Sequence, residues 1–315
     1  MDIRAFSLDD KYHLQQGSIY LTGIQALARL SLIQKQRDKE AGLNTAGFIS
    51  GYRGSPLGGL DQALWSIRER LEQHDIRFHA GLNEDLAATA VWGSQQLNLF
   101  PGANFEGVFG LWYGKGPGVD RSGDVFKHAN AAGTSKHGGV LLCMGDDHTA
   151  KSSTLPHQSE FSLMDAGIPI LNPASIQEIL DYGLYGWAMS RYSGCWVGLK
   201  TISETMDSSA SVNADTQRIQ IVEPHDFQLP HDGVHIRVND SPLQQEARLH
   251  KYKLYAAIAF ARANGLNRIV FDSGAPRLGI ITTGKSYLDV RQALRDLGID
   301  HKLAGDIGIR LYKVG

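Results

Sequence analysis

Carboxylates, histidines and hydroxyls are concentrated in the segment GDDHTAKSST (residues 145–154) and at His157 just beyond it. Asp146, Asp147 and His148 could bind a metal ion or a polar substrate at the end of an apolar run. A solvent-exposed loop with Asp and Ser at its turns has the same composition. The spacing matches neither H-E-x-x-H nor a pair of ligands four residues apart on a helix. The spacing therefore gives no support to a metal site. A binding site for a metal or polar substrate and a solvent-exposed loop both stay open as interpretations.

A second polar segment, KGPGVDRSGDVFKH (residues 115–128), is rich in glycine. Its glycines could surround an anionic group through their backbone amides. A loop that enters a helix at Arg121 or Ser122 explains the same residues equally well.

The run Gly279-Ile-Ile-Thr-Thr-Gly284-Lys285-Ser286 satisfies the nucleotide-binding pattern G-x-x-x-x-G-K-[ST]. In a P-loop the four central residues form a loop whose amides surround phosphate oxygens. Here those residues are Ile, Ile, Thr and Thr, which favour a strand, and only a short stretch of chain follows Ser286. We therefore expect a strand–turn–helix connection rather than an NTPase.

Glu84 begins a helix that is rich in small residues, NEDLAATAVWGSQQLNLF, directly after the candidate N-cap Asn83. A carboxylate in the first helical turn interacts favourably with the helix dipole, by about 0.3–1 kcal/mol. On composition alone, this structural role is the preferred interpretation of Glu84.

These residues lie within alternating helices and strands. Apolar strands are expected at 46–50, 106–112, 139–144, 168–171 and 195–201, with helical segments between them. Such continuous apolar runs indicate a parallel sheet covered on both faces, and ligands of these sheets bind outside the carboxyl ends of the strands. We therefore predict an α/β fold, with a doubly wound parallel sheet over residues 15–205.

The remainder of the chain predicts a second unit. Residues 206–234 are polar and irregular and are expected to form a linker. Beyond them the pattern favours a helix from Pro242 to Asn264, a strand over 278–283, a helix from Lys285 to about Leu297 and a final half-strand. Residues 235–315 are therefore predicted to be an incomplete second α/β domain.

Composition excludes several classes of protein. Lys plus Arg (31) nearly balances Asp plus Glu (33), which gives no basic footprint for nucleic acid or an anionic membrane. Cys143 and Cys195 are the only cysteines, too few for a disulfide scaffold, a four-Cys zinc site or a self-contained iron–sulfur cluster. No apolar run is long enough to cross a membrane, and the polar start MDIRAFSLDDKY is unlike a signal peptide. A cytoplasmic location is expected.

Three segments carry a resemblance to a known family, in the order TGIQALARL (22–30), GFISGYRGSPLGGLD (47–61) and NEDLAATAVWGSQQ (83–96). Together they resemble the pyrimidine-binding domain of thiamine-diphosphate-dependent 2-oxoacid:ferredoxin oxidoreductases, most closely the long, fused form of indolepyruvate ferredoxin oxidoreductase. GDDHTAKSST, IPILNPAS (168–175) and GIITTGKSYLDVRQAL (279–294) continue the similarity in order. The resemblance implies that residues 235–315 begin a domain like the C-terminal domain of transketolase.

The resemblance also implies roles for particular residues. Glu84 matches the glutamate that pairs with the aminopyrimidine ring of thiamine diphosphate. Arg53 and His148 are candidate substrate residues, although Arg53 and the stretch 57–59 depart from the commoner Pro and Thr/Ser-rich version of the turn. The residues implied to border the cofactor are Gly51, Tyr52, Gly54, Ser55 and Pro56.

The implied role of Glu84 has a clear chemical requirement. A carboxylic acid bonded to the pyrimidine ring nitrogen favours the imino tautomer, whose nitrogen can accept the C2 proton of the thiazolium ring. Burial favours the protonated carboxyl, whereas a helix N-terminus favours the ionised form. We therefore expect Glu84 to be buried.

The implied reaction is oxidative decarboxylation of an aryl 2-oxoacid, indolepyruvate, to an acyl-CoA, with electrons passed to ferredoxin. Mg²⁺ and iron–sulfur clusters are expected from parts of the enzyme outside this chain, because these residues lack the G-D-G motif with its Asn and the cysteines. The expected partners are the remaining domains of the enzyme, ferredoxin, the 2-oxoacid, CoA and a second copy in a homodimer. The chain alone is expected to be inactive. A catalytically silent α/β interaction module is the alternative.

Overall fold

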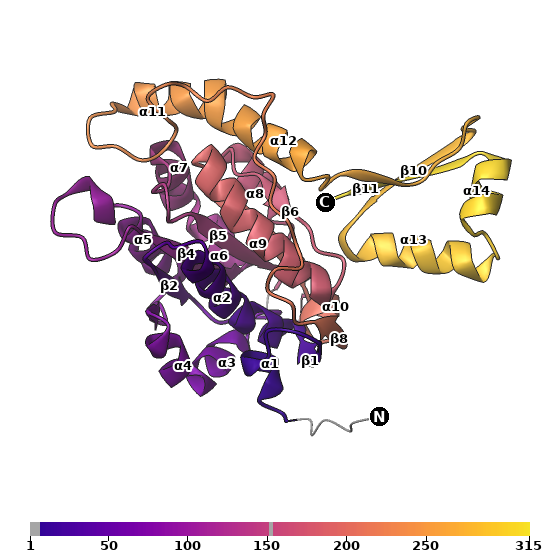
Figure 1. Ribbon diagram of the computed structural model, residues 1–315, viewed down its shortest axis with the longest axis horizontal. Helices are drawn as coiled ribbons and strands as arrows, with labels where there is room; N and C mark the ends of the chain where they lie inside the picture. Colours follow the sequence, from indigo (N-terminus) through magenta and orange to yellow (C-terminus); the bar gives the residue numbers. More distant parts are fainter. Residues whose placement is uncertain (1–6, 151–153) are drawn as a thin grey trace.

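The computed structural model describes residues 7–150 and 154–315 and shows a body built around a sheet, with a smaller arm at one side (Figure 1). The body contains a six-stranded sheet of order β3-β2-β4-β5-β7-β6, in which all neighbouring strands are parallel. Its strands are β2 (Thr45–Gly51), β3 (Ile76–Phe78), β4 (Gly107–Lys115), β5 (Val140–Asp146), β6 (Ile170–Leu171) and β7 (Val197–Ile202).

Helices cover both faces of this sheet because its central strands are apolar on both sides. Every residue of β5 is buried, for example, so the strand has no side facing solvent. One face packs against α2 (Gly23–Glu40), α3 (Leu60–Ser66), α4 (Arg68–Gln73) and α9 (Ile176–Ser193). The other face packs against α5 (Glu84–Ser94), α6 (Gly116–Arg121), α7 (Gly123–Ala132) and α8 (Glu160–Asp165). The predicted doubly wound α/β fold is confirmed.

The strand order reverses at β2, and this reversal determines where a ligand can bind. The chain passes from β2 to the edge strand β3 and then returns across β2 to β4 through α5. In parallel sheets the crevice outside the carboxyl ends of the strands at such a reversal is the usual ligand site. The segments that follow β2, β3 and β4 border this crevice.

A two-stranded antiparallel ribbon joins the ends of the body, between β1 (Ser18–Thr22) and β8 (Ser209–Asn213). Strand β8 lies within the segment expected to be irregular, so that expectation is wrong for these five residues. The pairing joins strands that are far apart in sequence, and few of the side chains in β8 are buried. The local sequence therefore has no apolar pattern that would predict this strand. Short helices α1 (Asp10–His13), η1 (Leu97–Leu99) and α10 (Ser203–Met206) complete this part of the chain.

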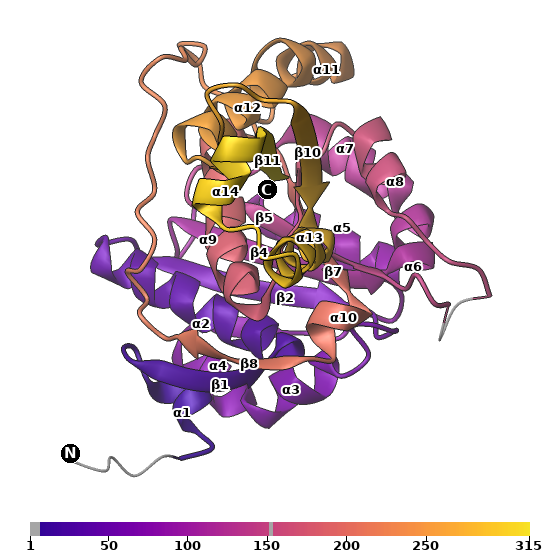
Figure 2. The same ribbon diagram turned by 90° about the vertical axis from the view of Figure 1, so that its right-hand side faces the viewer.

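The chain then runs along the outside of the body without regular structure until α11 (Pro242–Arg248), as Figure 2 shows. A π-helical turn, η2 (Leu249–Lys253), continues into α12 (Leu254–Ala263). Phe260 of α12 is fully buried and packs on Tyr192 of α9, so these helices share the core of the body.

The arm is formed by residues 268–315 and has a separate core. Its sheet has the order β10-β11-β9, with β10 and β11 parallel and β9 antiparallel to β11. Its elements are β9 (Arg268–Phe271), β10 (Leu278–Thr283), α13 (Gly284–Asp296), α14 (His301–Ile307) and β11 (Ile309–Val314). The predicted boundaries at 205 and 234 and the likeness of the second unit to a transketolase C-terminal domain stay predictions.

The P-loop pattern lies at the junction of β10 and α13. Its four central residues, 280–283, belong to the strand, and the helix begins at Gly284. A Cβ on Gly284 would lie 2.5 Å from Asn172 Oδ1, so this backbone packs against the body. Lys285 pairs with Asp289 on its own helix. The predicted strand–turn–helix connection is confirmed.

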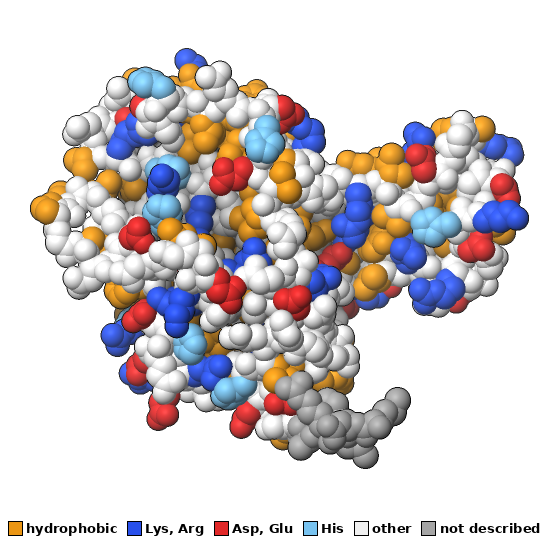
Figure 3. Space-filling model, in the orientation of Figure 1, with side chains coloured by type: hydrophobic (Ala, Val, Ile, Leu, Met, Phe, Trp, Pro, Cys, Tyr) orange, Lys and Arg blue, Asp and Glu red, His pale blue; other side chains and the backbone are white. Residues whose placement is uncertain are grey.

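The surface and the helix lengths agree with the composition. Acidic and basic side chains are intermixed on the face of the molecule shown in Figure 3. Among the residues that the structure describes, none of the helices combines the length and apolar character needed to cross a membrane.

A buried ion pair connects the arm to the body. Lys313 of β11 is fully buried and bonds to Glu178 of α9. The rings of Tyr182 and Tyr287 lie 5.3 and 4.7 Å from Lys313 Nζ. Burial lowers the pKa of Lys313, and the bond to Glu178 opposes this effect. The bond to Glu178 therefore offsets the cost of burying the charged ammonium group of Lys313.

We expect Glu178→Gln to lower the free energy of unfolding by about 3 kcal/mol, because removing one partner leaves a buried charge uncompensated. Urea unfolding of the chain measures this change. The matched control is Asp289→Asn, which removes the partner of Lys285 at the surface and should cost no more than about 0.5 kcal/mol. Equal effects of the two substitutions would contradict the role of Glu178.

Candidate functional site

Glu84 lies beside the end of β4, next to the strand reversal, and is only 7% exposed. Its helix starts where predicted, because Asn83 Oδ1 accepts a hydrogen bond of 2.9 Å from the backbone N–H of Leu86. Trp112 Nε1 donates to the backbone carbonyl of Glu84 at 3.1 Å. The backbone N–H of Gly81 donates to the carbonyl of Gly51 at 2.8 Å, which holds the loop before α5 beside the end of β2.

Glycines form the wall around the Glu84 side chain. A Cβ on Gly118 of α6 would lie 2.4 Å from Glu84 Cγ and 2.7 Å from Oε1, and one on Gly114 would lie 3.4 Å from Cγ. Among the described residues, no hydrogen bond or ion pair reaches the Glu84 carboxylate. A buried carboxyl without a partner loses solvation without compensation. The niche therefore fits an external group that bonds to this carboxyl.

The turn after β2 is packed onto the end of β4. A Cβ on Gly51 would lie 2.2 Å from the carbonyl oxygen of Tyr113, and the N–H of Tyr52 donates to the same oxygen at 3.0 Å. A Cβ on Gly54 would lie 2.7 Å from Lys115 Cδ. The turn and the niche of Glu84 therefore lie at the same edge of the sheet.

The remaining predicted site residues surround this edge of the sheet. Ser55 and Pro56 are joined by a cis peptide bond, and Pro56 lies against Gly145 near the end of β5. Arg53 and His148 are exposed in the loops after β2 and β5. No contact of either residue with Glu84 occurs among the described residues, so their roles stay predictions. Residues 151–153 lie outside the described residues.

One interpretation of residues 115–128 is a loop that enters a helix at Arg121 or Ser122. A helix, α7, does begin after its N-cap Ser122, but the preceding residues are not a loop. Helix α6 begins at Gly116, directly after β4, with Pro117 in its first turn. The glycines of this segment are explained by close contacts: Gly118 faces Glu84, and Gly116 faces the ring of His157. Their spacing of two residues on opposite sides of a short helix gave no recognisable motif.

Asp146 is not a solvated loop residue. It is fully buried at the end of β5 and accepts hydrogen bonds from the backbone N–H (3.0 Å) and Oγ (2.5 Å) of Ser159. The structure also places His157 beside it, with His157 Nδ1 3.7 Å from Asp146 Oδ1. Within the described part of the chain, no three His, Cys, Asp or Glu side chains are grouped as metal ligands.

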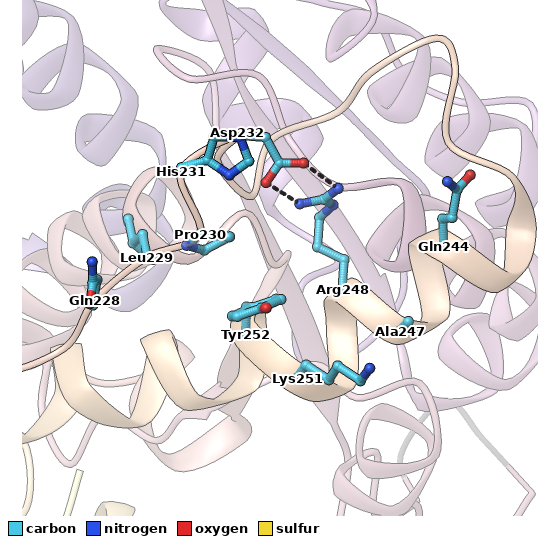
Figure 4. Close-up of a pocket in the computed structure, with 10 residues that line it drawn as sticks. All are labelled: Gln228, Leu229, Pro230, His231, Asp232, Gln244, Ala247, Arg248, Lys251 and Tyr252. Carbon is cyan, nitrogen blue, oxygen red and sulfur yellow. Dashed lines mark hydrogen bonds and ion pairs between the residues drawn. The ribbon is translucent and has the colours of Figure 1, made fainter.

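A separate cleft of about 570 Å³ lies between residues 228–232 and the helical run α11–η2 (Figure 4). The Arg248 guanidinium forms two hydrogen bonds with the Asp232 carboxylate, at 3.1 and 2.9 Å, and these lower the pKa of Asp232 to about 2. Arg248 also bonds to Asp240 at 3.2 Å. Arg248, Asp232 and Asp240 thus neutralise one another, which favours a structural role for these three residues.

Comparison with solved structures first identifies the fold. The fold matches the solved structure "2-oxoglutarate:ferredoxin oxidoreductase from Magnetococcus marinus with 2-oxoglutarate, coenzyme A and succinyl-CoA bound", with a TM-score of 0.68. The match covers 95% of this chain and 54% of that chain at 14% sequence identity. The fold is therefore that of a 2-oxoacid:ferredoxin oxidoreductase.

Sequence comparison is more particular. The chain is 26% identical over 294 residues to indolepyruvate oxidoreductase subunit IorA of Methanothermobacter marburgensis. This alignment covers 93% of this chain and 43% of that protein. It is 24% identical over 261 residues to subunit IorA of Pyrococcus abyssi, covering 81% and 37%. Residues 268–315 match the family described as indolepyruvate oxidoreductase domain. The resemblance to this family is confirmed, and the chain spans less than half the length of these relatives.

The packing of Gly118 on Glu84 predicts the effect of added side-chain volume. We expect Gly118→Ala to lower the free energy of unfolding by about 1–3 kcal/mol, because its Cβ would overlap the Glu84 side chain. Gly123→Ala is the control, since a Cβ there meets nothing within 4 Å and alanine favours the helix by up to about 1 kcal/mol. Thermal unfolding distinguishes the two, and a neutral Gly118→Ala would show that the contact is loose.

Proposed function

We propose that this chain provides the part of a 2-oxoacid:ferredoxin oxidoreductase that binds the pyrimidine of thiamine diphosphate, and that the substrate is an aryl 2-oxoacid such as indolepyruvate. The observation that carries this proposal is the Glu84 carboxyl, which is buried, faces glycine backbone and has no partner among the described residues. It lies at the strand reversal, where parallel sheets bind ligands. The names of the relatives, indolepyruvate oxidoreductase subunit IorA, support the substrate.

Each residue of the niche has a distinct task in this proposal. Thiamine diphosphate, when bound, supplies the electron sink for decarboxylation of the 2-oxoacid. Glu84 holds a proton at the pyrimidine ring nitrogen, and Gly118 and Gly114 leave space for its side chain and set its position. Gly51, Tyr52, Gly54, Ser55 and Pro56 border the cofactor. Arg53 and His148 are proposed to contact the 2-oxoacid.

Apolar side chains beside the niche support a covering partner. Leu82, Leu86 and Tyr52 are 81%, 52% and 39% exposed on either side of Glu84. Exposed apolar surface of this kind is typical of an interface. We propose that the remaining domains of the enzyme cover it and supply Mg²⁺ and iron–sulfur clusters, with ferredoxin, CoA and a second copy in a homodimer as further partners. The chain alone is then inactive, and the cytoplasm is the proposed location.

We expect Glu84→Gln to lower turnover of the full-length enzyme at least about 100-fold, because the amide keeps the shape of the side chain but cannot share a proton. The assay is indolepyruvate-dependent reduction of ferredoxin or a viologen dye. Glu69→Gln is the control, since Glu69 is an exposed carboxylate in the first turn of α4 and has no hydrogen bond or ion pair among the residues that the structure describes.

If Glu84→Gln and Glu69→Gln had equal turnover, Glu84 would have no catalytic role and would only interact with the dipole of its helix. That result would favour the catalytically silent interaction module instead.

A further inference from the structure

We propose that His157 is a positioning residue that keeps the carboxyl of Glu84 in place by holding helix α6 against it. This inference rests on the proposed function, because positioning Glu84 matters for turnover only if its carboxyl takes part in the reaction. Its basis is a chain of side-chain contacts that runs from the buried end of β5, through His157 and α6, to Glu84.

His157 connects α6 to the sheet. Its Nε2 lies 2.7 Å from Asp120 Oδ2 on α6, and its Nδ1 lies 3.4 Å from Ser159 Oγ and 3.7 Å from Asp146 Oδ1. The side chain of His157 is 17% exposed, whereas that of Asp146 is fully buried. Hydrogen bonds to both ring nitrogens fix the orientation of an imidazole.

The sheet end of this connection is rigid. Asp146 lies in β5 and accepts hydrogen bonds from the backbone and the side chain of Ser159. Lys200 of the neighbouring strand β7 lies 3.4 Å from Asp146 Oδ2 and also bonds to Glu160. Residues of the adjacent strands β5 and β7 therefore fix the position of the Asp146 carboxylate, which lies next to the imidazole of His157.

The α6 end of the connection is a close fit. A Cβ on Gly116 would lie 2.1 Å from Cγ of His157, so the ring packs directly on the helix backbone. Asp120 is fixed in turn, because Ser162 Oγ donates to its Oδ1 at 2.9 Å. His157 therefore contacts α6 at its first turn and again near its end.

Glu84 touches the same helix between these two contacts, at Gly118. On its other side α6 is tied to α5 by Arg121, whose Nε lies 3.0 Å from Asp85 Oδ2. A helix of six residues is unstable without tertiary contacts. Since α6 packs against the side chain of Glu84 at Gly118, loss of the His157 contacts should let the helix and the carboxyl move. A displacement of about 1 Å can lower a rate about 100-fold.

The test uses the full-length enzyme with His157→Leu, His157→Gln and the control His128→Leu. His128 pairs with Asp124 at 3.5 Å on the exposed side of α7. We expect His157→Leu to lower kcat at least tenfold, while the KM for indolepyruvate and the Kd for thiamine diphosphate change less than threefold. The near-ultraviolet circular dichroism of the bound pyrimidine tautomer should weaken in parallel. His157→Gln should recover most of both signals, because its amide can donate to Asp120.

A readout without cofactor accompanies the kinetics. Hydrogen exchange of the apo enzyme should become faster at 116–121 and 84–88 in His157→Leu, but not in His157→Gln or His128→Leu. Asp120→Ala should act in the same direction, and it tests the same bond at a side chain that is 57% exposed if His157→Leu fails to fold.

Unchanged kcat in folded His157→Leu, or faster exchange that is confined to 154–159, would overturn the proposal. The two hypotheses fail separately. An active Glu84→Gln enzyme refutes the proposed function, whereas slow exchange of α6 in His157→Leu refutes the positioning role.

Discussion

The contact between the Gly118 backbone and the Glu84 side chain is the constraint on which the site depends. It places a largely buried carboxyl against glycine backbone, at the strand reversal of a parallel sheet. The surrounding parts serve this contact. Asn83 fixes the start of α5, Trp112 holds the first carbonyl of that helix, and the turn after Gly51 closes the neighbouring side.

The fold contributes rigidity rather than chemistry. Strands β2, β4 and β5 end side by side, so three separate segments of the chain meet at one edge of the sheet. Some polar groups at this edge belong to buried residues such as Asp146, whereas Arg53 and His148 lie exposed in the loops. A carboxyl that must share one proton with a bound ring gains from such surroundings, because its geometry is fixed before the ligand arrives.

The features that sequence could predict are those with local signals. Continuous apolar runs located the strands around Phe48, Leu111 and Cys143, and the N-cap at Asn83 located the helix of Glu84. The contacts of Asp120 with His157 and of β1 with β8 join residues far apart in the chain and leave no periodic pattern. Helix α6 was missed for a related reason, since its glycines reflect neighbours that only the folded chain brings close.

The junction of arm and body is polar at its centre, where Lys313 meets Glu178 between two tyrosine rings. Apolar surfaces can slide over one another at little cost. A buried ion pair instead fixes one relative position of the arm and the body, because its two charged groups must meet. Exchange of the arm between related enzymes would therefore succeed only when the acidic residue of α9 is inherited with it.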